Sequence, residues 1–200
     1  MERPILFSER MVAAILAGTK TQTRRIVKPP WELSGDFLTH PIGNDRFCGY
    51  KCPYGKMGDQ LWVRESWEPV QISMGIFGVK YKDGTIQKTS HTVELAHAWG
   101  DVYHPAKAGK WRPSIHMPRW ASRLTLEVTV TGFARLQEIT EEDAIAEGAP
   151  AIPRLDGSDP RFHRQSFAGL WDTINGDRPG CAWEDNPLVW VVGFKRVPNG

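Results

Sequence analysis

The chain has 200 residues, of which 40% are hydrophobic, and its formal net charge is only +2. This length allows one domain with a buried core, and this composition excludes wholesale disorder. No run approaches the about 18 consecutive apolar residues of a membrane helix, so we expect no contact with a membrane.

The three cysteines, Cys48, Cys52 and Cys181, are too few and too irregularly spaced for a disulfide framework. Cys48 and Cys52, with His40 nearby, form a C-x3-C pair that lacks a fourth ligand at a zinc-like spacing. The N-terminus shows no cationic start followed by an apolar core and a cleavage site. We therefore expect a cytoplasmic protein that holds no metal and no cofactor.

Charge is distributed unevenly along the chain. Residues 10–31 and 102–126 contain basic residues and no acid, whereas residues 127–159 carry eight acids against two arginines. Segregation of this kind can focus a positive field on one face, as a phosphate-bearing partner requires. The alternative is a surface with blocks of charge and no role in binding.

The first half of the chain predicts a helix, a basic extended segment, a loop and a strand. Ser8 is a suitable N-cap for a short helix that Gly18 ends. A polar, β-branched and basic segment follows at 19–27. Residues 32–58 are rich in glycine and proline and are predicted to form a loop. The sequence QLWVRESW at 60–67 predicts a strand.

The middle of the chain predicts an insertion and then further strands. Residues 68–113 contain a hairpin signal around Asp83-Gly84 and several prolines, and we interpret them as an insertion on a small barrel. A short strand is expected at 114–117. The alternation of apolar and polar residues at 123–136 predicts a long, half-buried strand.

The C-terminal part predicts two helices and a final strand. Thr140 opens a helix with Asp143 three residues later as a variant capping box, and Gly148 lies past its end. A second helix is expected over 160–175, followed by an apolar strand at 188–197. The whole order predicts an α+β fold, a small mixed β-barrel flanked by about three helices. A doubly wound parallel sheet is disfavoured, because no βαβ rhythm with phosphate-loop glycines is present.

Three motifs carry a resemblance to a known family. They are ILAGTKTQTRR at 15–25, GDQLWVRE at 58–65 and LQEIT at 136–140. In this order they resemble the ASCH domain over about 4–67 and 112–197. The resemblance implies a PUA-like β-barrel with a cleft beside the first helix.

The resemblance also implies the domain organisation. The chain is expected to be a single ASCH domain over 1–200, with the insertion at about 68–113. The segment PSIHMPRW at 113–120 is similar to the larger members encoded by phages and prophages. Many members of the family are described as RNA binders.

One branch of the family hydrolyses the amide of N4-acetylcytidine with a lysine, a threonine three residues later and a glutamate in the helix after the long strand. These positions match Lys20, Thr23 and Glu147 of this chain. If the segment is extended, Lys20 and Thr23 point to opposite faces, so their convergence requires a turn or a bend. The alternative is that Lys20 contacts a phosphate, Thr23 is an ordinary strand residue and Glu147 is a solvated acid.

The predicted substrate or nucleic-acid contacts combine cations, aromatic rings and one carboxylate. They are Arg24, Arg25, Lys28, Trp31, Arg64, Glu65, Arg119 and Trp120. Cations that hold phosphates beside rings that stack on bases are typical of single-strand recognition. Glu65 alternatively forms a structural pair with an arginine such as Arg24 or Arg25.

These observations leave three hypotheses about function. The first is a metal-free amidohydrolase that acts on an N4-acylated cytosine nucleoside or a related modified nucleobase. The second is a non-catalytic module that binds RNA or modified nucleic acid, and the third is a ribonuclease. The expected partner is thus a modified nucleoside or a single-stranded nucleic acid.

Overall fold

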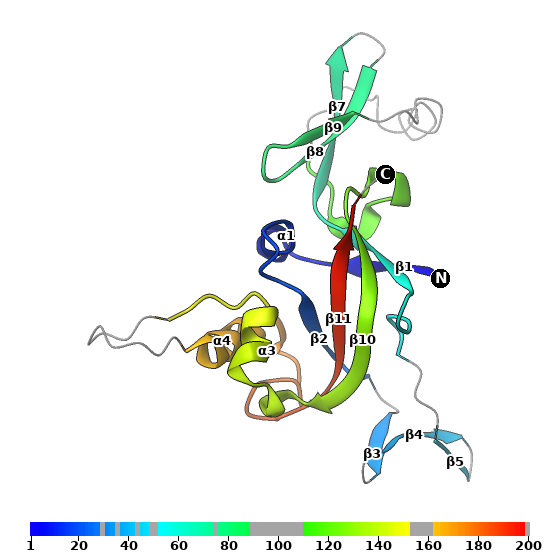
Figure 1. Ribbon diagram of the computed structural model, residues 1–200, viewed down its shortest axis with the longest axis vertical. Coiled ribbons are helices and arrows are strands. Elements are labelled where there is room, and N and C mark those ends of the chain that lie inside the picture. Colours follow the sequence, from blue (N-terminus) through cyan, green and yellow to red (C-terminus); the bar gives the residue numbers. More distant parts are fainter. Residues whose placement is uncertain are drawn as a thin grey trace. The chain divides into compact units, whose positions relative to one another are not determined.

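The computed structural model describes residues 1–28, 31–34, 37–42, 45–48, 52–73, 76–88, 110–152 and 162–198 (Figure 1). They form a mixed α+β structure. The chain divides into two compact units. The first contains Met1–Leu16, Gln60–Leu126 and Arg196–Gly200, and the second contains Ala17–Asp59 and Glu127–Lys195.

The first unit contains one α-helix, one parallel strand pair and one three-stranded antiparallel sheet. Its elements are β1 (Glu2–Leu6), α1 (Glu9–Leu16), β6 (Gln60–Arg64), β7 (Trp67–Ser73), β8 (Ile76–Tyr81) and β9 (Ile86–Lys88). β1 runs parallel to β6, and β8 pairs antiparallel with both β7 and β9. Val12 and Ile15 of α1 are buried, and the Ser8 hydroxyl accepts a 3.5 Å hydrogen bond from the Met11 amide, as expected of an N-cap.

Two short 3₁₀ helices, at Ser114–His116 and Arg119–Ala121, lie in the same unit. The strand predicted at 114–117 is therefore wrong. Each helix directly follows a proline, Pro113 or Pro118, in extended conformation. A proline fixes φ and lacks the amide hydrogen that a strand ladder needs, so this segment turns instead of extending.

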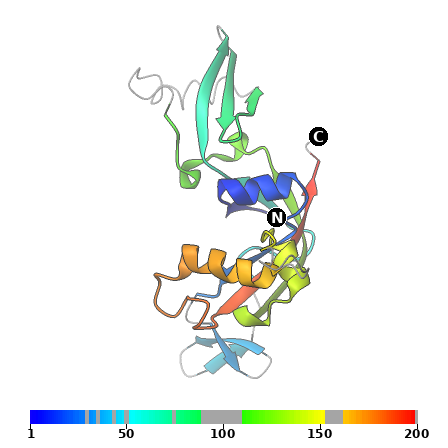
Figure 2. The ribbon, with the colours of Figure 1, turned by 90° about the vertical axis from the view of Figure 1, so that its left-hand side faces the viewer.

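The second unit combines strands of the main sheet, two helices and a small sheet. Its elements are β2 (Gln22–Ile26), β3 (Glu32–Ser34), β4 (Phe37–Ile42), β5 (Asp45–Cys48), α3 (Glu141–Ala146), α4 (His163–Asn175), and most of β10 (Thr125–Arg135) and of β11 (Leu188–Val197). α3 packs against α4 and β2 (Figures 1 and 2). The loop predicted at 32–58 is partly wrong, because β3, β4 and β5 form an antiparallel sheet there.

The core of the second unit lies where the helices meet the sheet. Its buried residues include Leu136, Ile139, Ala144, Phe167, Trp171 and Val189. α4 begins at His163, and the predicted helix start at Pro160 lies outside the described residues. Ile174, near the end of α4, is 51% exposed.

The five-stranded sheet has the order β1-β6-β10-β11-β2. β10 and β11 coincide with the two strands predicted from alternation and apolarity. β1 and β2 are the edge strands of this sheet, so the described part of the chain forms an open sheet and not the closed barrel that we expected.

Candidate functional site

The candidate site lies in the second unit, around Lys20 and the strand β2 that follows it. β2 pairs antiparallel with β11, and Thr23 and Arg24 stand opposite Val192 and Val191. Lys20 lies just before β2 and forms an antiparallel bridge with Glu147. The Thr21 amide donates a 2.8 Å hydrogen bond to the Ala146 carbonyl oxygen. The segment is thereby fixed to β11 on one side and to the end of α3 on the other.

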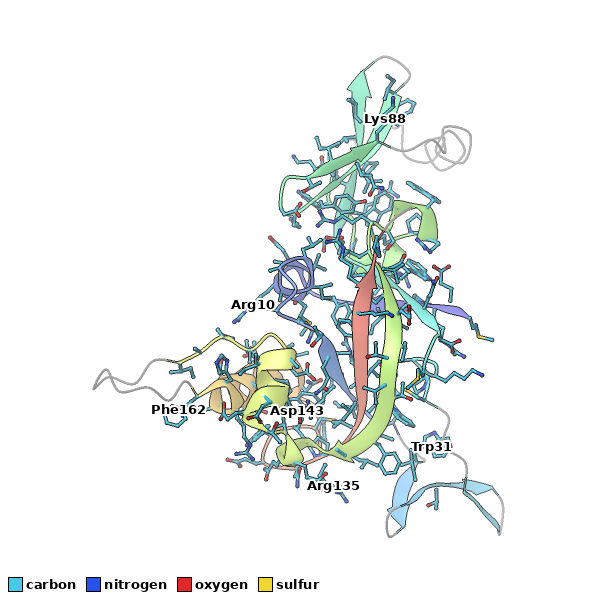
Figure 3. All side chains as sticks on the ribbon, viewed as in Figure 1. Arg10, Trp31, Lys88, Arg135, Asp143 and Phe162 are labelled. Atoms are coloured by element: carbon cyan, nitrogen blue, oxygen red, sulfur yellow. The ribbon has the colours of Figure 1, made fainter. Side chains whose placement is uncertain are left out.

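α3 places two carboxylates toward β2. The Thr140 hydroxyl accepts a 3.1 Å hydrogen bond from the Asp143 amide, and the Asp143 carboxylate accepts one of 3.3 Å from the Thr140 amide, which confirms the predicted capping box. Glu147 is the C-cap, and Gly148 adopts φ 74°, the left-handed conformation that ends a helix and that glycine tolerates. Asp143 and Glu147, four residues apart, thus share one face of α3. Figure 3 shows the Asp143 side chain on this helix.

Lys20 and Glu147 form a buried ion pair. The Lys20 Nζ lies 2.9 Å from the Glu147 Oε2, and the two side chains are only 1% and 5% exposed. The same nitrogen donates 2.8 Å hydrogen bonds to the carbonyl oxygens of Gln22 and Glu147. An ammonium group has three donors, so these acceptors fully satisfy the protonated form of Lys20.

Arg24 joins the two carboxylates of α3. Its Nη1 lies 3.3 Å from the Glu147 Oε1, and its Nη2 lies 2.8 Å from the Asp143 Oδ2. The Gln22 Nε2 donates to the Asp143 Oδ1 at 3.2 Å. Asp143 and Gln22 were not among the predicted site residues. The Asp143–Glu147 spacing, which puts both on one helical face, is the signal that could have found Asp143.

Burial and neighbouring charges shift the pKa values of Lys20 and Asp143. Burial lowers the pKa of Lys20, Glu147 opposes this effect, and the charges of Arg25 and Arg24 add to the lowering. Burial raises the pKa of Asp143, but hydrogen bonding to Gln22 and the charge of Arg24 outweigh it, so this pKa lies below its ordinary value. A lysine with a lowered pKa beside a carboxylate suits general acid–base chemistry.

Thr23 is 2% exposed in the middle of β2. Side chains alternate along a strand, so Gln22 and Arg24 share one face of β2, and Thr23 and Arg25 share the other. Lys20 precedes the regular strand, so the alternation does not fix its direction relative to Thr23. The structure thus brings Lys20 and Glu147 into contact and leaves the participation of Thr23 a prediction.

Three other predicted contacts lie in the second unit. Arg25 is half-buried, and burial lowers its pKa while Tyr54 and Glu147 raise it. Lys28 is exposed and Trp31 is half-buried.

The remaining predicted contacts lie in the first unit. Glu65 pairs with Arg123, whose Nε and Nη2 lie 2.9 Å from its two carboxylate oxygens. The structural pair of Glu65 with an arginine is therefore confirmed, and the arginine is Arg123 instead of Arg24 or Arg25. The Arg123 guanidinium also lies 2.7 Å from Asp83, which anchors the turn of the β8–β9 hairpin.

Arg64, Arg119 and Trp120 are likewise engaged within the first unit. The Arg64 guanidinium lies 5.4 Å from the ring centroid of Trp62 and donates to the Ile115 carbonyl oxygen. Arg119 pairs with Glu2 at 2.6 Å. Trp120 packs edge-on against Trp67, with 5.8 Å between the ring centroids. These side chains have structural partners, and a ligand that contacts the arginines must compete with them.

The described residues bear on two further classes, metal sites and membrane spans. They contain no group of three or more His, Cys, Asp or Glu side chains that could hold a metal ion. None of the helices described is long and apolar enough to cross a membrane.

Comparison with known proteins gives one similarity. No family model and no curated protein matches the chain. Among solved structures, the chain is similar to a high-resolution crystal structure of an ASCH domain from Lactobacillus crispatus JV V101. The TM-score is 0.39 and the sequence identity 12%, over 98% of this chain and 79% of that chain. Such a likeness is too slight to fix either the fold or the function of this protein.

Proposed function

We propose that the protein is a metal-free amidohydrolase that removes the acyl group from the exocyclic N4 amine of a cytosine nucleoside or a related modified base. The observation that carries this proposal is the buried contact of 2.9 Å between Lys20 and Glu147. A buried lysine beside a carboxylate is a general acid–base pair that needs no metal. Its residues are also those that the resemblance to the amidohydrolase branch of the ASCH family implies.

In this reaction water is added across the acyl carbon–N4 bond. A hydroxyl group attacks the acyl carbon while the neutral amine of Lys20 takes its proton. The carbon–nitrogen bond then breaks, and Lys20 returns the proton to the leaving N4 amine. Glu147 orients the Lys20 amine. If the hydroxyl belongs to a side chain, water hydrolyses the resulting ester in a second step with the same proton transfers. The products are the cytosine nucleoside or base with a free N4 amine and a carboxylic acid.

To test the proposal, the purified chain is incubated with N4-acetylcytidine, and the change in ultraviolet absorbance that accompanies deacylation is measured. We expect turnover by the wild type and a loss of about 10²–10⁴-fold in kcat/KM for Lys20→Ala and Glu147→Gln, the usual contribution of acid–base catalysis. Lys195→Ala, which removes an exposed cation from the same unit, is the control and should retain activity. Absence of turnover with every acylated cytosine nucleoside, in a folded wild-type sample, would refute the proposal.

Thr23 is proposed as the attacking hydroxyl, with direct attack by water as the competing route. Thr23→Ser keeps a hydroxyl and Thr23→Val keeps the shape, and both fit a buried strand position of 2% exposure. If Thr23 is the nucleophile, the serine variant stays active and the valine variant loses turnover. Equal activity of the two variants assigns the attack to water.

A second candidate function, binding of single-stranded nucleic acid, is favoured by a surface on the first unit. The Lys82 and Lys80 Nζ atoms lie 3.9 and 6.0 Å from the ring centroid of Trp111, which is 37% exposed. Lys110 and Arg112 flank this ring in sequence. Cations beside an exposed aromatic ring suit phosphates and stacked bases.

Fluorescence titration of Trp111 with a short single-stranded RNA tests this candidate. Binding should weaken steeply with salt and fall further in Lys82→Ala, whereas Lys195→Ala in the other unit serves as the control. Salt-independent binding would contradict it. The length of the RNA after incubation separates binding from cleavage.

A further inference from the structure

The β7–β8–β9 sheet of the first unit has two faces of opposite character. Residues that stand directly opposite each other on paired strands share a face, and successive residues along a strand alternate between faces. On one face Trp67, Val79 and Tyr81 are buried and pack against Met117 and Ala121. The other face, called the outer face, carries Glu68, Lys80, Ile86 and Lys88.

Trp111 lies beside β7 on the outer face. The next residue, Arg112, is bridged antiparallel to Trp67 by backbone hydrogen bonds of 2.7 and 3.2 Å. The side chain of Trp111 therefore lies on the face opposite to that of Arg112. The Nζ atoms of Lys80 and Lys82 lie 6.0 and 3.9 Å from the Trp111 ring centroid, which places Lys82 on the outer face as well.

Three lysines form a line across the outer face. Lys80 and Lys82 are two positions apart in the chain, a rise of about 7 Å in extended backbone. Lys88 stands opposite Gly78, so it is the diagonal neighbour of Lys80, at about 7–8 Å. The Lys88 side chain, at the end of β9, is labelled in Figure 3. This regular spacing is comparable with that of successive phosphates in an extended single strand.

The charge of this line is accessible and positive. Lys82 and Lys88 are exposed, and they take part in no ion pair with the residues that the structure describes. The side chain of Glu68 is only 10% exposed and lies 4.0 Å from the Nζ of the middle lysine. Asp83, which follows Lys82, is bound by the Arg123 guanidinium at 2.7 Å. Neither acid therefore neutralises the outer two lysines.

Apolar surface flanks the line of lysines on both sides. Trp111, on the β7 side, is 37% exposed, and Ile86, opposite Lys80 on β9, is 51% exposed. Ile72 is 47% exposed, and its Cδ1 lies 2.9 Å from the position that a Cβ on Gly78 would take. Cations beside an exposed ring suit a polymer that alternates phosphates with bases, whereas an acidic peptide would use the cations alone.

We propose that the outer face is a platform for a single-stranded polynucleotide, with one base stacked on Trp111 and successive phosphates held by Lys82, Lys80 and Lys88. This inference rests on the second candidate function in one respect, namely that the surface at Trp111 binds nucleic acid. It extends that surface across the sheet to β9, where Ile86 supports a neighbouring base.

The experiment is a titration of a fluorescein-labelled oligouridylate with the full chain at several salt concentrations. For single strands, the logarithm of the binding constant falls with the logarithm of the salt concentration by about 0.7 per neutralised phosphate, so the three lysines contribute about 2 to this slope. Lys88→Ala and Lys82→Ala should each reduce the slope by about 0.7. Lys195→Ala, which removes an exposed cation of the second unit, is the matched control and should leave the slope unchanged.

Stacking is tested separately from charge. Trp111→Ala should weaken binding about 5–150-fold, the loss expected for one stacked base, without changing the slope. Trp111→Phe keeps an aromatic ring and should lose less. A duplex of the same length has its base faces covered and should displace the labelled strand poorly. If Trp111→Ala bound normally and polyglutamate displaced the strand as well as unlabelled RNA does, the outer face would be a site for an acidic protein and the proposal would be overturned.

The Lys88 variant distinguishes the platform from the smaller surface at Trp111. Binding with an unchanged slope in Lys88→Ala would keep the second candidate function and overturn the platform. No binding by the wild type would reject both. Unlabelled oligouridylate and oligothymidylate, used as competitors, show whether RNA or DNA is the preferred strand, and the reduced slope is required with that strand. The strands carry no acyl group, so the result is independent of the proposed deacylation.

Discussion

Two ion pairs of the second unit differ in burial and should differ in their effect on stability. Lys20→Met leaves Glu147 buried with one cation fewer, and we expect the free energy of unfolding to fall by about 3–5 kcal/mol. Lys195→Met is the matched control, because Lys195 lies 3.0 Å from Glu127 with the side chains 61% and 37% exposed. Its loss should stay below about 1 kcal/mol. Urea denaturation measures both, and equal losses would contradict the burial of the Lys20 pair.

The pair of Glu65 and Arg123 predicts a pH dependence in the first unit. Burial raises the pKa of Glu65, and Arg123 opposes this effect. A carboxyl group whose pKa is raised in the folded state contributes most stability below its unfolded pKa, and this stability is lost as the pH rises through the folded value. We therefore expect Arg123→Met to be strongly destabilised at neutral pH and to recover partly on acidification toward the ordinary glutamate pKa. Chemical unfolding at several pH values checks this, and a destabilisation independent of pH would contradict it.

At the scale of single residues, the sequence predicted which residues belong to the site better than it predicted which of them form pairs. Lys20 and Glu147 follow from the resemblance, and the structure brings them together. The bonds of Arg24 to α3 were missed, because they join residues more than a hundred positions apart. No local pattern reports such a contact. For the same reason Glu65 was assigned to arginines of the basic segment, whereas it meets Arg123.

At the scale of elements, the end of α3 determines where the Glu147 carboxylate lies. Gly148→Ala puts a side chain at φ 74° and should cost about 1–2 kcal/mol of unfolding free energy. Gly169→Ala is the matched control, because a Cβ there, within α4, meets nothing within 4 Å. This control should be stabilised by about 0.4–1 kcal/mol. Thermal unfolding measures both, and stabilisation by both substitutions would contradict the left-handed helix end.

The elements that the sequence predicted correctly are those with a strong local signal. Alternation of apolar and polar residues predicted β10, and an apolar run predicted β11. Caps and glycines predicted α1 and α3. The missed strands β1, β3, β4, β5 and β7 are 3–7 residues long, and β1, β4 and β7 contain proline. Short strands of this kind are stabilised by pairing with distant residues, which no local pattern reveals.

At the scale of the whole molecule, we expect the loss of stability at low pH to depend on Asp143. Its pKa is lowered in the folded protein, so its contribution to stability is present above the ordinary aspartate pKa and is lost as the pH falls through the lowered value. Asp143→Asn should therefore be less stable than the wild type at neutral pH, and the difference should vanish in acid. Glu142→Gln, an exposed change in the same helix, is the control and should show little difference at either pH. If the free energy of unfolding varied with pH in the same way for the wild type and Asp143→Asn, the bonding of Asp143 to Arg24 and Gln22 would be contradicted.

The global arrangement was the least predictable level. The sequence indicated strands and helices in nearly the right order, yet it predicted closure of the sheet where the described strands leave an open one. Closure depends on how many strands meet and how they are staggered, which is a property of pairings across the chain. The α+β class, by contrast, follows from the elements alone.

The alignment of β2 on β11, with Arg24 opposite Val191, has a consequence for evolution and for protein engineering. Sliding β2 by a single position would exchange the two faces of the strand. Thr23 and Arg25 would then lie on the face that Gln22 and Arg24 now occupy, and Arg24 would leave both carboxylates of α3. A substitution in β2 changes one contact of the site, whereas an insertion or deletion that slides the strand changes all of them at once.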